Sequence, residues 1–70
     1  MTVREVLQLE SYRNEVPVFF AAQKEGFAEF MDHEAVPEKY LDMEALGYEY
    51  LSEGDGNIRH DTLWIDVKEV

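Results

Sequence analysis

The chain has 70 residues, enough for one domain over residues 1–70, and its 16 acidic and 6 basic residues give a net charge of −10. Cysteine is absent, which excludes disulfides and thiolate chemistry and is typical of a reducing cytosol. Hydrophobic residues make up 46% of the chain, too many for a disordered segment. The longest apolar run, residues 16–22, falls short of the roughly 20 residues that cross a bilayer. The start lacks a basic region followed by an apolar stretch, so we expect a soluble cytoplasmic domain without a secretory signal.

The first predicted element is a helix over residues 2–11. Thr2 and Glu5 form a capping box, in which the Thr2 hydroxyl accepts from the Glu5 amide and the Glu5 carboxylate accepts from the Thr2 amide. Val3, Val6 and Leu7 then recur at helical spacing. The polar stretch that begins at the end of this range predicts where the helix stops.

Two strands are expected next. Residues 16–22 form a β-branched and aromatic run typical of a strand covered on both faces. Pro17 belongs at its beginning or on an edge, because proline cannot donate to a ladder. Residues 23–26 then predict a hairpin turn into a second strand at residues 27–31. A helix over residues 27–35 competes, since the apolar residues there also fit the 3.6-residue period, but the glycine of the turn favours the hairpin.

The middle of the chain predicts a loop over residues 32–42, with one helical turn at residues 37–40 that starts at a proline. Residues 43–52 follow as a strand. One face of that strand carries Leu46, Tyr48 and Tyr50. The glycine-rich residues 53–57 are the strongest turn signal in the chain.

Residues 58–67 alternate clearly between apolar and mixed positions. Leu63, Ile65 and Val67 face one way, and Thr62, Trp64 and Asp66 face the other. Either of these two faces can be the core face on the sequence alone. The order helix, hairpin, loop, hairpin predicts an α+β fold, with one N-terminal helix packed on a small antiparallel sheet of about four strands.

The acidic residues are concentrated in one segment. It contains a single base, Lys39, and ten carboxylates, namely Glu25, Glu29, Asp32, Glu34, Glu38, Asp42, Glu44, Glu49, Glu53 and Asp55. Aromatic and aliphatic residues are interspersed, so we expect a folded surface and not a solvated tail. Such a surface repels nucleic acid and anionic membranes and attracts basic proteins.

Motifs for catalysis or metal binding are not found. His33-Glu34 is followed by Pro37, where a zinc hydrolase helix needs its second histidine. The glycine-rich stretch at residues 53–57 lacks the ligand spacing of an EF-hand. Pairs of carboxylates are plentiful, but so short a chain can hardly enclose the cleft that glycosidic chemistry needs. We therefore expect no enzyme activity, no metal and no cofactor.

The opening Met-Thr-Val-Arg-Glu-Val-Leu, with a late turn leading to Leu63-Trp64-Ile65-Asp66-Val67, is similar to small accessory proteins of phages and mobile elements of Gram-positive bacteria. The resemblance covers residues 1–9 and the sheet pattern of residues 43–67. It implies no catalytic residues. It does imply a host-interaction or counter-defence role, as in anti-CRISPR and anti-restriction proteins, several of which are small, acidic and mimic DNA.

The favoured hypothesis is a non-catalytic interaction module whose ten carboxylates occupy a basic, nucleic-acid-binding site on a host protein. Spaced carboxylates on a rigid sheet can imitate a phosphate array, and their field speeds the encounter. The alternative is an oligomeric accessory protein, a homodimer for example, in which strand edges pair two copies and the acid only keeps the protein soluble. Neither hypothesis involves direct contact with nucleic acid or membrane.

Overall fold

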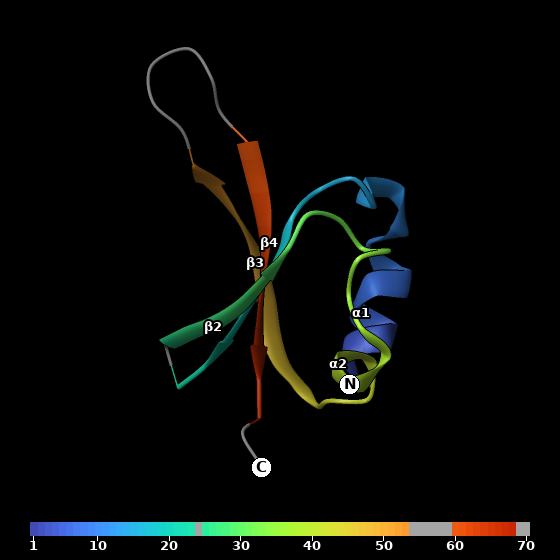
Figure 1. Cartoon of the computed structure of the whole chain (residues 1–70), viewed down its shortest axis with the longest axis vertical. Helices are drawn as coiled ribbons and strands as arrows, with labels where there is room; N and C mark the ends of the chain where they lie inside the picture. Colours follow the sequence, from blue (N-terminus) through green and yellow to red (C-terminus); the bar gives the residue numbers. More distant parts are fainter. Residues whose placement is uncertain (24, 54–59, 69–70) are drawn as a thin grey trace.

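The computed structural model describes residues 1–23, 25–53 and 60–68. Its elements are α1 (Val3–Leu9), the 3₁₀ turn η1 (Ser11–Arg13), β1 (Val18–Ala22), β2 (Glu25–Phe30), α2 (Glu38–Leu41), β3 (Ala45–Glu53) and β4 (His60–Val67). Both helices lie on one side of a twisted four-stranded sheet (Figure 1). The predicted α+β class is therefore confirmed. The turn predicted at residues 53–57 falls largely outside the described residues.

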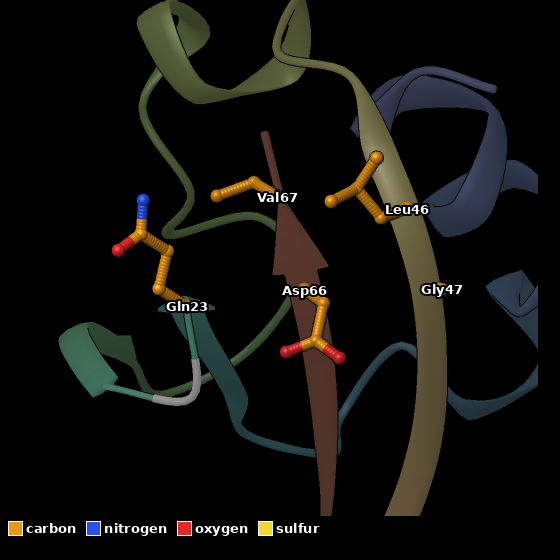
Figure 2. A pocket seen from close by; sticks show the side chains of 5 residues that line it. All are labelled: Gln23, Leu46, Gly47, Asp66 and Val67. Carbon is orange, nitrogen blue, oxygen red and sulfur yellow. The ribbon is translucent and has the colours of Figure 1, made fainter. Parts of the chain in front are cut away.

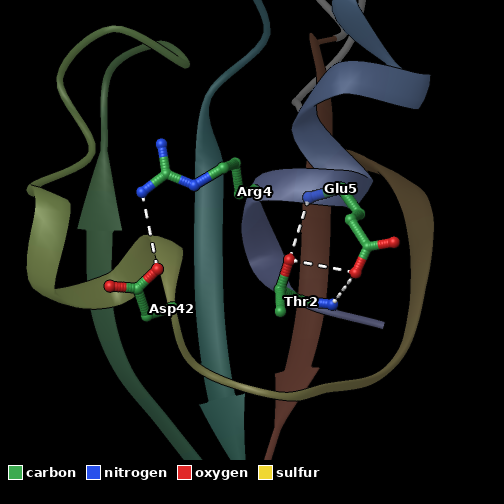
Figure 3. A network of polar contacts seen from close by, with 4 residues as sticks. All are labelled: Thr2, Arg4, Glu5 and Asp42. Carbon is green, nitrogen blue, oxygen red and sulfur yellow. Dashed lines mark hydrogen bonds and ion pairs between the residues drawn. The ribbon is translucent and has the colours of Figure 1, made fainter.

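Helix α1 begins at the predicted capping box (Figure 3). The Glu5 amide donates to Thr2 Oγ1 at 3.2 Å, and the Thr2 amide donates to Glu5 Oε1 at 2.9 Å. Hydrogen bonds from Thr2 hold the pKa of Glu5 below its usual value, and the bond from the Thr2 amide has the largest effect. The helix ends at Leu9, two residues before the predicted end, and continues as η1. The cap also lies beside the start of β3, because the Val3 amide donates to the Met43 carbonyl at 2.9 Å.

We expect Thr2→Ala to lower the free energy of unfolding by about 1 kcal/mol, because two donors at the helix start lose their reciprocal arrangement. Urea denaturation measures the difference. Thr2→Ser keeps the hydroxyl and is expected to retain most of the stability, and Ser11→Ala, at an exposed serine of η1, is a second control. Equal midpoints for Thr2→Ala and the unmodified chain would contradict the prediction.

The sheet is mixed, in the order β2-β1-β4-β3. The two hairpins, β1–β2 and β3–β4, are antiparallel as predicted, whereas the central strands β1 and β4 run parallel, with Val18 opposite Leu63. An entirely antiparallel sheet was therefore the wrong expectation at its centre. Turn chemistry determines pairing within each hairpin, but the pairing between hairpins depends on how the intervening chain returns, which local sequence does not reveal.

The competing predictions for the first hairpin are resolved in favour of strands. Strand β1 starts directly after Pro17, and β2 runs from Glu25 to Phe30, so a helix over residues 27–35 is wrong. The expectation that both faces of β1 are covered holds fully on the helix side, where Val18 and Phe20 are buried. On the other side it holds in part, because Ala21 has no exposed surface but Phe19 is half-buried.

Both outer strands contain a β-bulge. Ala21 pairs with Gly26 but Phe20 with Ala28, which leaves Phe27 as the extra residue of β2. In β3 the extra residue is Leu46, which is 66% exposed. A bulge resets the alternation of side chains. The simple alternation of the sequence predicted that Leu46 shares a face with Tyr48 and Tyr50. Because of the bulge, Leu46 does not share their core-facing side.

The core lies between α1 and the sheet. Val3 and Val6 of the helix pack against the Leu63 face of β4, which is the core face of that strand. The single helical turn predicted at residues 37–40 is confirmed as α2, and its Tyr40 stacks on Phe20 with ring centroids 5.1 Å apart. In the part of the chain that the structure describes, no helix has the length and apolar character needed to cross a membrane.

A polar network joins η1 to the far end of the sheet. Arg13 forms an ion pair with Asp61, which also accepts a 2.8 Å hydrogen bond from Ser52. Both contacts lower the pKa of Asp61, and the hydrogen bond from Ser52 has the larger effect. The Arg13 guanidinium also lies 4.0 Å from the centroid of the Tyr50 ring. The pKa of Tyr50 is raised to about 12, mainly by burial and secondly by the nearby Glu10. We interpret Arg13, Asp61 and Ser52 as structural, because they pair with one another within the fold. The buried Tyr50 hydroxyl has no hydrogen-bond partner among the described residues.

Candidate protein-interaction surface

The sheet face opposite the helices, which we call the open face, is not the polar surface that a solvated face usually is. Strand register and the alternation of side chains assign its residues. They are Phe19, Ala21, Gly26, Glu29, Gly47, Glu49, Leu51, Thr62, Trp64 and Asp66. Both helices lie on the other side of the sheet (Figure 1). Apolar residues among carboxylates on such a face are typical of a binding surface.

An aromatic pair occupies the middle of the open face. Phe19 and Trp64 are stacked, with ring centroids 4.2 Å apart and an interplanar angle of 26°. Trp64 Nε1 is buried and has no hydrogen-bond partner among the described residues, so the accessible part of the indole is its carbon surface. The Phe19 ring lies over Gly26, where an added Cβ would overlap it. The stack therefore depends on a glycine in the neighbouring strand.

Carboxylates flank this pair on both sides. The register places Glu29, Phe19, Trp64 and Glu49 in one row across the four strands. Both glutamates are exposed, and Asp66, also exposed, lies two residues along β4 from the tryptophan. Directly opposite residues in such a ladder have Cβ atoms about 5 Å apart. Each ring thus has a carboxylate as its outer neighbour.

The predicted acidic surface is divided by the fold. Among the eight predicted carboxylates from Glu25 to Glu49, the register assigns Glu29 and Glu49 alone to the open face. Asp32, Glu34, Glu38, Asp42 and Glu44 lie on the connection between β2 and β3, which includes α2, and Glu25 pairs with Ala22 next to the hairpin turn. Glu53 ends β3, and Asp55 is outside the described residues.

Two described bases approach this predicted set. Arg4 lies 3.4 Å from Asp42 (Figure 3) and Lys68 lies 3.9 Å from Glu44, both in exposed pairs. Exposed pairs of this kind contribute little to stability. Neither pair involves a carboxylate of the open face. None of the described bases therefore competes with a partner for the open-face carboxylates.

Sequence reasoning missed Asp66 as a site residue because it lies outside the acidic segment. The signal was present, since the alternation of β4 places Asp66 on the same face as Trp64. Phe19 was missed because a β-branched and aromatic run looks like a buried strand. Its partner across the sheet is Trp64, and that contact depends on the parallel β1–β4 pairing.

A hollow lies at one end of the open face (Figure 2). Its volume is about 220 Å³, and its lining consists of Gln23, Leu46, Gly47, Asp66 and Val67. A Cβ added at Gly47 would meet nothing within 4 Å, so the space above this glycine is open. Figure 2 shows the Asp66 carboxylate between the Gln23 side of the hollow and the Gly47 backbone. The exposed Leu46 side chain adds an apolar wall.

The second depression is polar and lies between Asn14, Glu15, Asp32 and Glu34. Across the described ranges, no group of three or more histidine, aspartate and glutamate side chains is arranged to hold a metal ion. His33 borders this region with a buried Nε2 that lacks a hydrogen-bond partner among the described residues. Burial lowers the pKa of His33 from 6.5, although Asp32 and Glu10 oppose the effect.

A pH dependence follows from His33. Its pKa is lower in the folded state than in the unfolded chain, so the unfolded chain takes up the proton first as pH falls. The stability that neutral His33 contributes is complete above pH 6.5 and is lost as pH falls from there through the folded pKa. We expect urea midpoints to decrease over this window, and His33→Gln to remove that decrease. His60→Gln is the control for the second histidine, and an unchanged profile in His33→Gln would contradict the prediction.

Comparison of the chain with protein-family models, curated proteins and solved structures gave no match.

Proposed function

We propose that this chain is a non-catalytic interaction module whose open face binds a basic protein surface. The observation that supports this proposal is the stacked Phe19–Trp64 pair flanked by the exposed Glu29 and Glu49. Tryptophan is enriched among the residues that dominate binding energy, and an apolar centre with a polar rim is the usual anatomy of a protein interface. The aromatic centre supplies buried area, and the acidic rim selects the charge of the partner.

The proposed partner is basic because acidic residues outnumber basic residues in the chain, 16 to 6. Among the eight carboxylates from Glu25 to Glu49, all except Asp32 are exposed. With a net charge of −10, the whole molecule steers a positively charged partner towards it and repels an acidic one. Electrostatic complementarity of this kind acts mainly on specificity and on the rate of association.

A nucleic-acid-binding protein is the proposed target class. Carboxylates on a rigid sheet can take the place of phosphates at a basic groove, which is how a DNA-mimic inhibitor of the anti-CRISPR or anti-restriction type works. The size and charge of the chain and the similarity of residues 1–9 to phage and mobile-element proteins support this proposal. A cytoplasmic site of action belongs to the same proposal.

The test compares two double variants with the same change in charge. Glu29→Lys/Glu49→Lys alters the open face, and Glu34→Lys/Glu38→Lys alters the β2–β3 connection, each raising the net charge by four from −10 to −6. All three proteins are immobilised and used to capture partners from nuclease-treated host lysate. Elution is then followed with increasing salt and with duplex DNA as competitor.

We expect the unmodified protein and the Glu34→Lys/Glu38→Lys variant to retain a basic protein that the open-face variant loses. Retention should fall steeply with salt, because screening acts over about 8 Å at physiological ionic strength. Release by DNA would support the mimic. Equal loss in both variants would assign binding to the general field, and equal retention in all three at high salt would overturn the proposal.

A homodimer is the second candidate, because β3 is an edge strand with exposed apolar residues. Leu46 is 66% and Tyr48 37% exposed, and pairing of two copies along β3 would cover them. Sedimentation velocity distinguishes the candidates. A dimer that dissociates in Tyr48→Lys would favour this candidate, whereas a monomer at all concentrations would exclude it.

A further inference from the structure

We infer that the hollow beside Gly47 accepts the side chain of an arginine presented by the basic partner. The inference rests on the proposed function and adds to it the chemical group that is recognised. The hollow lies where β3, β4 and the β1–β2 turn meet, and Asp66 is the carboxylate in its lining.

The size of the hollow decides between classes of occupant. Sites for drug-sized ligands and cofactors have volumes of about 300–1,000 Å³, and this hollow has about 220 Å³. One long side chain fits this space, whereas a nucleotide-sized cofactor does not.

The lining matches the two parts of an arginine. Leu46 forms an apolar side for the methylene stem beside the open space at Gly47. Asp66 is exposed and has no ion-pair partner among the described residues, so it can pair with the guanidinium. A planar guanidinium can bond both oxygens of a carboxylate at once, and it is more weakly hydrated than the ammonium of lysine. The side chain of Gln23 adds an amide oxygen that can accept from the same head group.

Trp64 lies next to this position. Gly47 pairs with Asp66 and Glu49 pairs with Trp64, so the indole and Glu49 are the next positions along the two strands. Asp66 and Trp64 are two residues apart on β4, which at the rise of a strand is roughly 7 Å and within reach of an aromatic ring. A guanidinium at Asp66 therefore comes close to the carbon surface of the indole, where cation–π attraction favours arginine.

The test uses short glycine–serine peptides that carry arginine, lysine or citrulline at the same positions. Anisotropy of a labelled peptide measures affinity at low ionic strength, and the single tryptophan of the chain reports contact near the hollow. The amide signal of Gly47 in a ¹H–¹⁵N spectrum locates the bound side chain. The variants are Asp66→Asn, which removes the charge, and Gly47→Leu, which fills a space that is open. Glu38→Gln, an exposed carboxylate on α2, matches the charge change of Asp66→Asn away from the open face.

We expect the arginine peptide to bind roughly 5- to 10-fold more tightly than the lysine peptide and to shift the Gly47 amide, because a charged bidentate pair is the stronger one. Asp66→Asn and Gly47→Leu should each remove that preference, and Glu38→Gln should keep it. Equal affinities for arginine and lysine, or a Gly47→Leu variant that binds like the unmodified chain, would overturn the inference. If the captured basic partner still depends on Glu29 and Glu49 in that case, the proposed function stands without the arginine site.

Discussion

Replacing Leu63 with alanine should lower the free energy of unfolding by about 2–5 kcal/mol. Leu63 has no exposed surface and lies in the core, between α1 and the centre of the sheet. Alanine would leave a cavity that its neighbours fill only in part. A domain of this size has a total stability of about 0.05–0.15 kcal/mol per residue, so the variant should be close to unfolded at 37 °C.

Leu46→Ala is the matched control, because it is the same substitution at a leucine that is 66% exposed. Urea denaturation of the two variants at 25 °C gives the comparison, and we expect Leu46→Ala to change the midpoint little. A cost below about 1 kcal/mol at Leu63 would contradict the assignment of that face of β4 to the core.

Replacing Gly26 with alanine should destabilise the protein by about 1–3 kcal/mol, the usual range for overpacking. The new methyl group would occupy the place of the Phe19 ring, which would have to leave its position on Trp64. Gly26 is exposed, so inspection of burial alone would predict a neutral effect. The environment of Trp64 should change with the displacement, and its fluorescence spectrum should shift.

Gly47→Ala is the counterpart on the other outer strand. Both glycines adjoin a bulge, yet an added Cβ at Gly47 meets no atom within 4 Å. We expect an unchanged or slightly higher stability there, because glycine weakens a strand interior, and an unchanged tryptophan spectrum. Equal effects of the two substitutions would show that Phe19 does not depend on the space above Gly26.

The elements that were predictable from the sequence are those with a short-range signal. Thr2 and Glu5 are three residues apart, and their reciprocal hydrogen bonds need only one turn of helix. The alternation that contains Leu63 and Ile65 is equally local, although the choice of its core face required the position of α1. Local patterns thus predicted the class of the fold and most of its strands.

The remaining features depend on contacts between distant residues. The bulge residues Phe27 and Leu46 are not distinguished by residue type, because a bulge arises from the demands of the partner strand. Parallel pairing of Val18 with Leu63 depends on the return of the chain after the first hairpin. Errors in the predicted sheet therefore occurred at the bulges and between the hairpins.

The same limit applied to the candidate site. The density of acidic residues in the sequence pointed to Glu29 and Glu49. Only the register of all four strands shows that these two glutamates flank one aromatic pair. Asp66 was outside the segment selected by charge. Conversely, Glu34 and Glu38 share the charge signal, and the fold places them on the β2–β3 connection.

The parallel pairing of β1 with β4 has a consequence for how the chain folds during synthesis. Strand β1 ends at Ala22 and β4 begins at His60, so the centre of the sheet closes only after the chain through β4 has left the ribosome. Pairing over such sequence separations slows folding, because a long loop must close before its contacts form. Until then, the inner edge of β1 offers unpaired N–H and C=O groups to any other chain. We therefore expect translation that stops before β4 to yield aggregation-prone fragments and no stable half-domain.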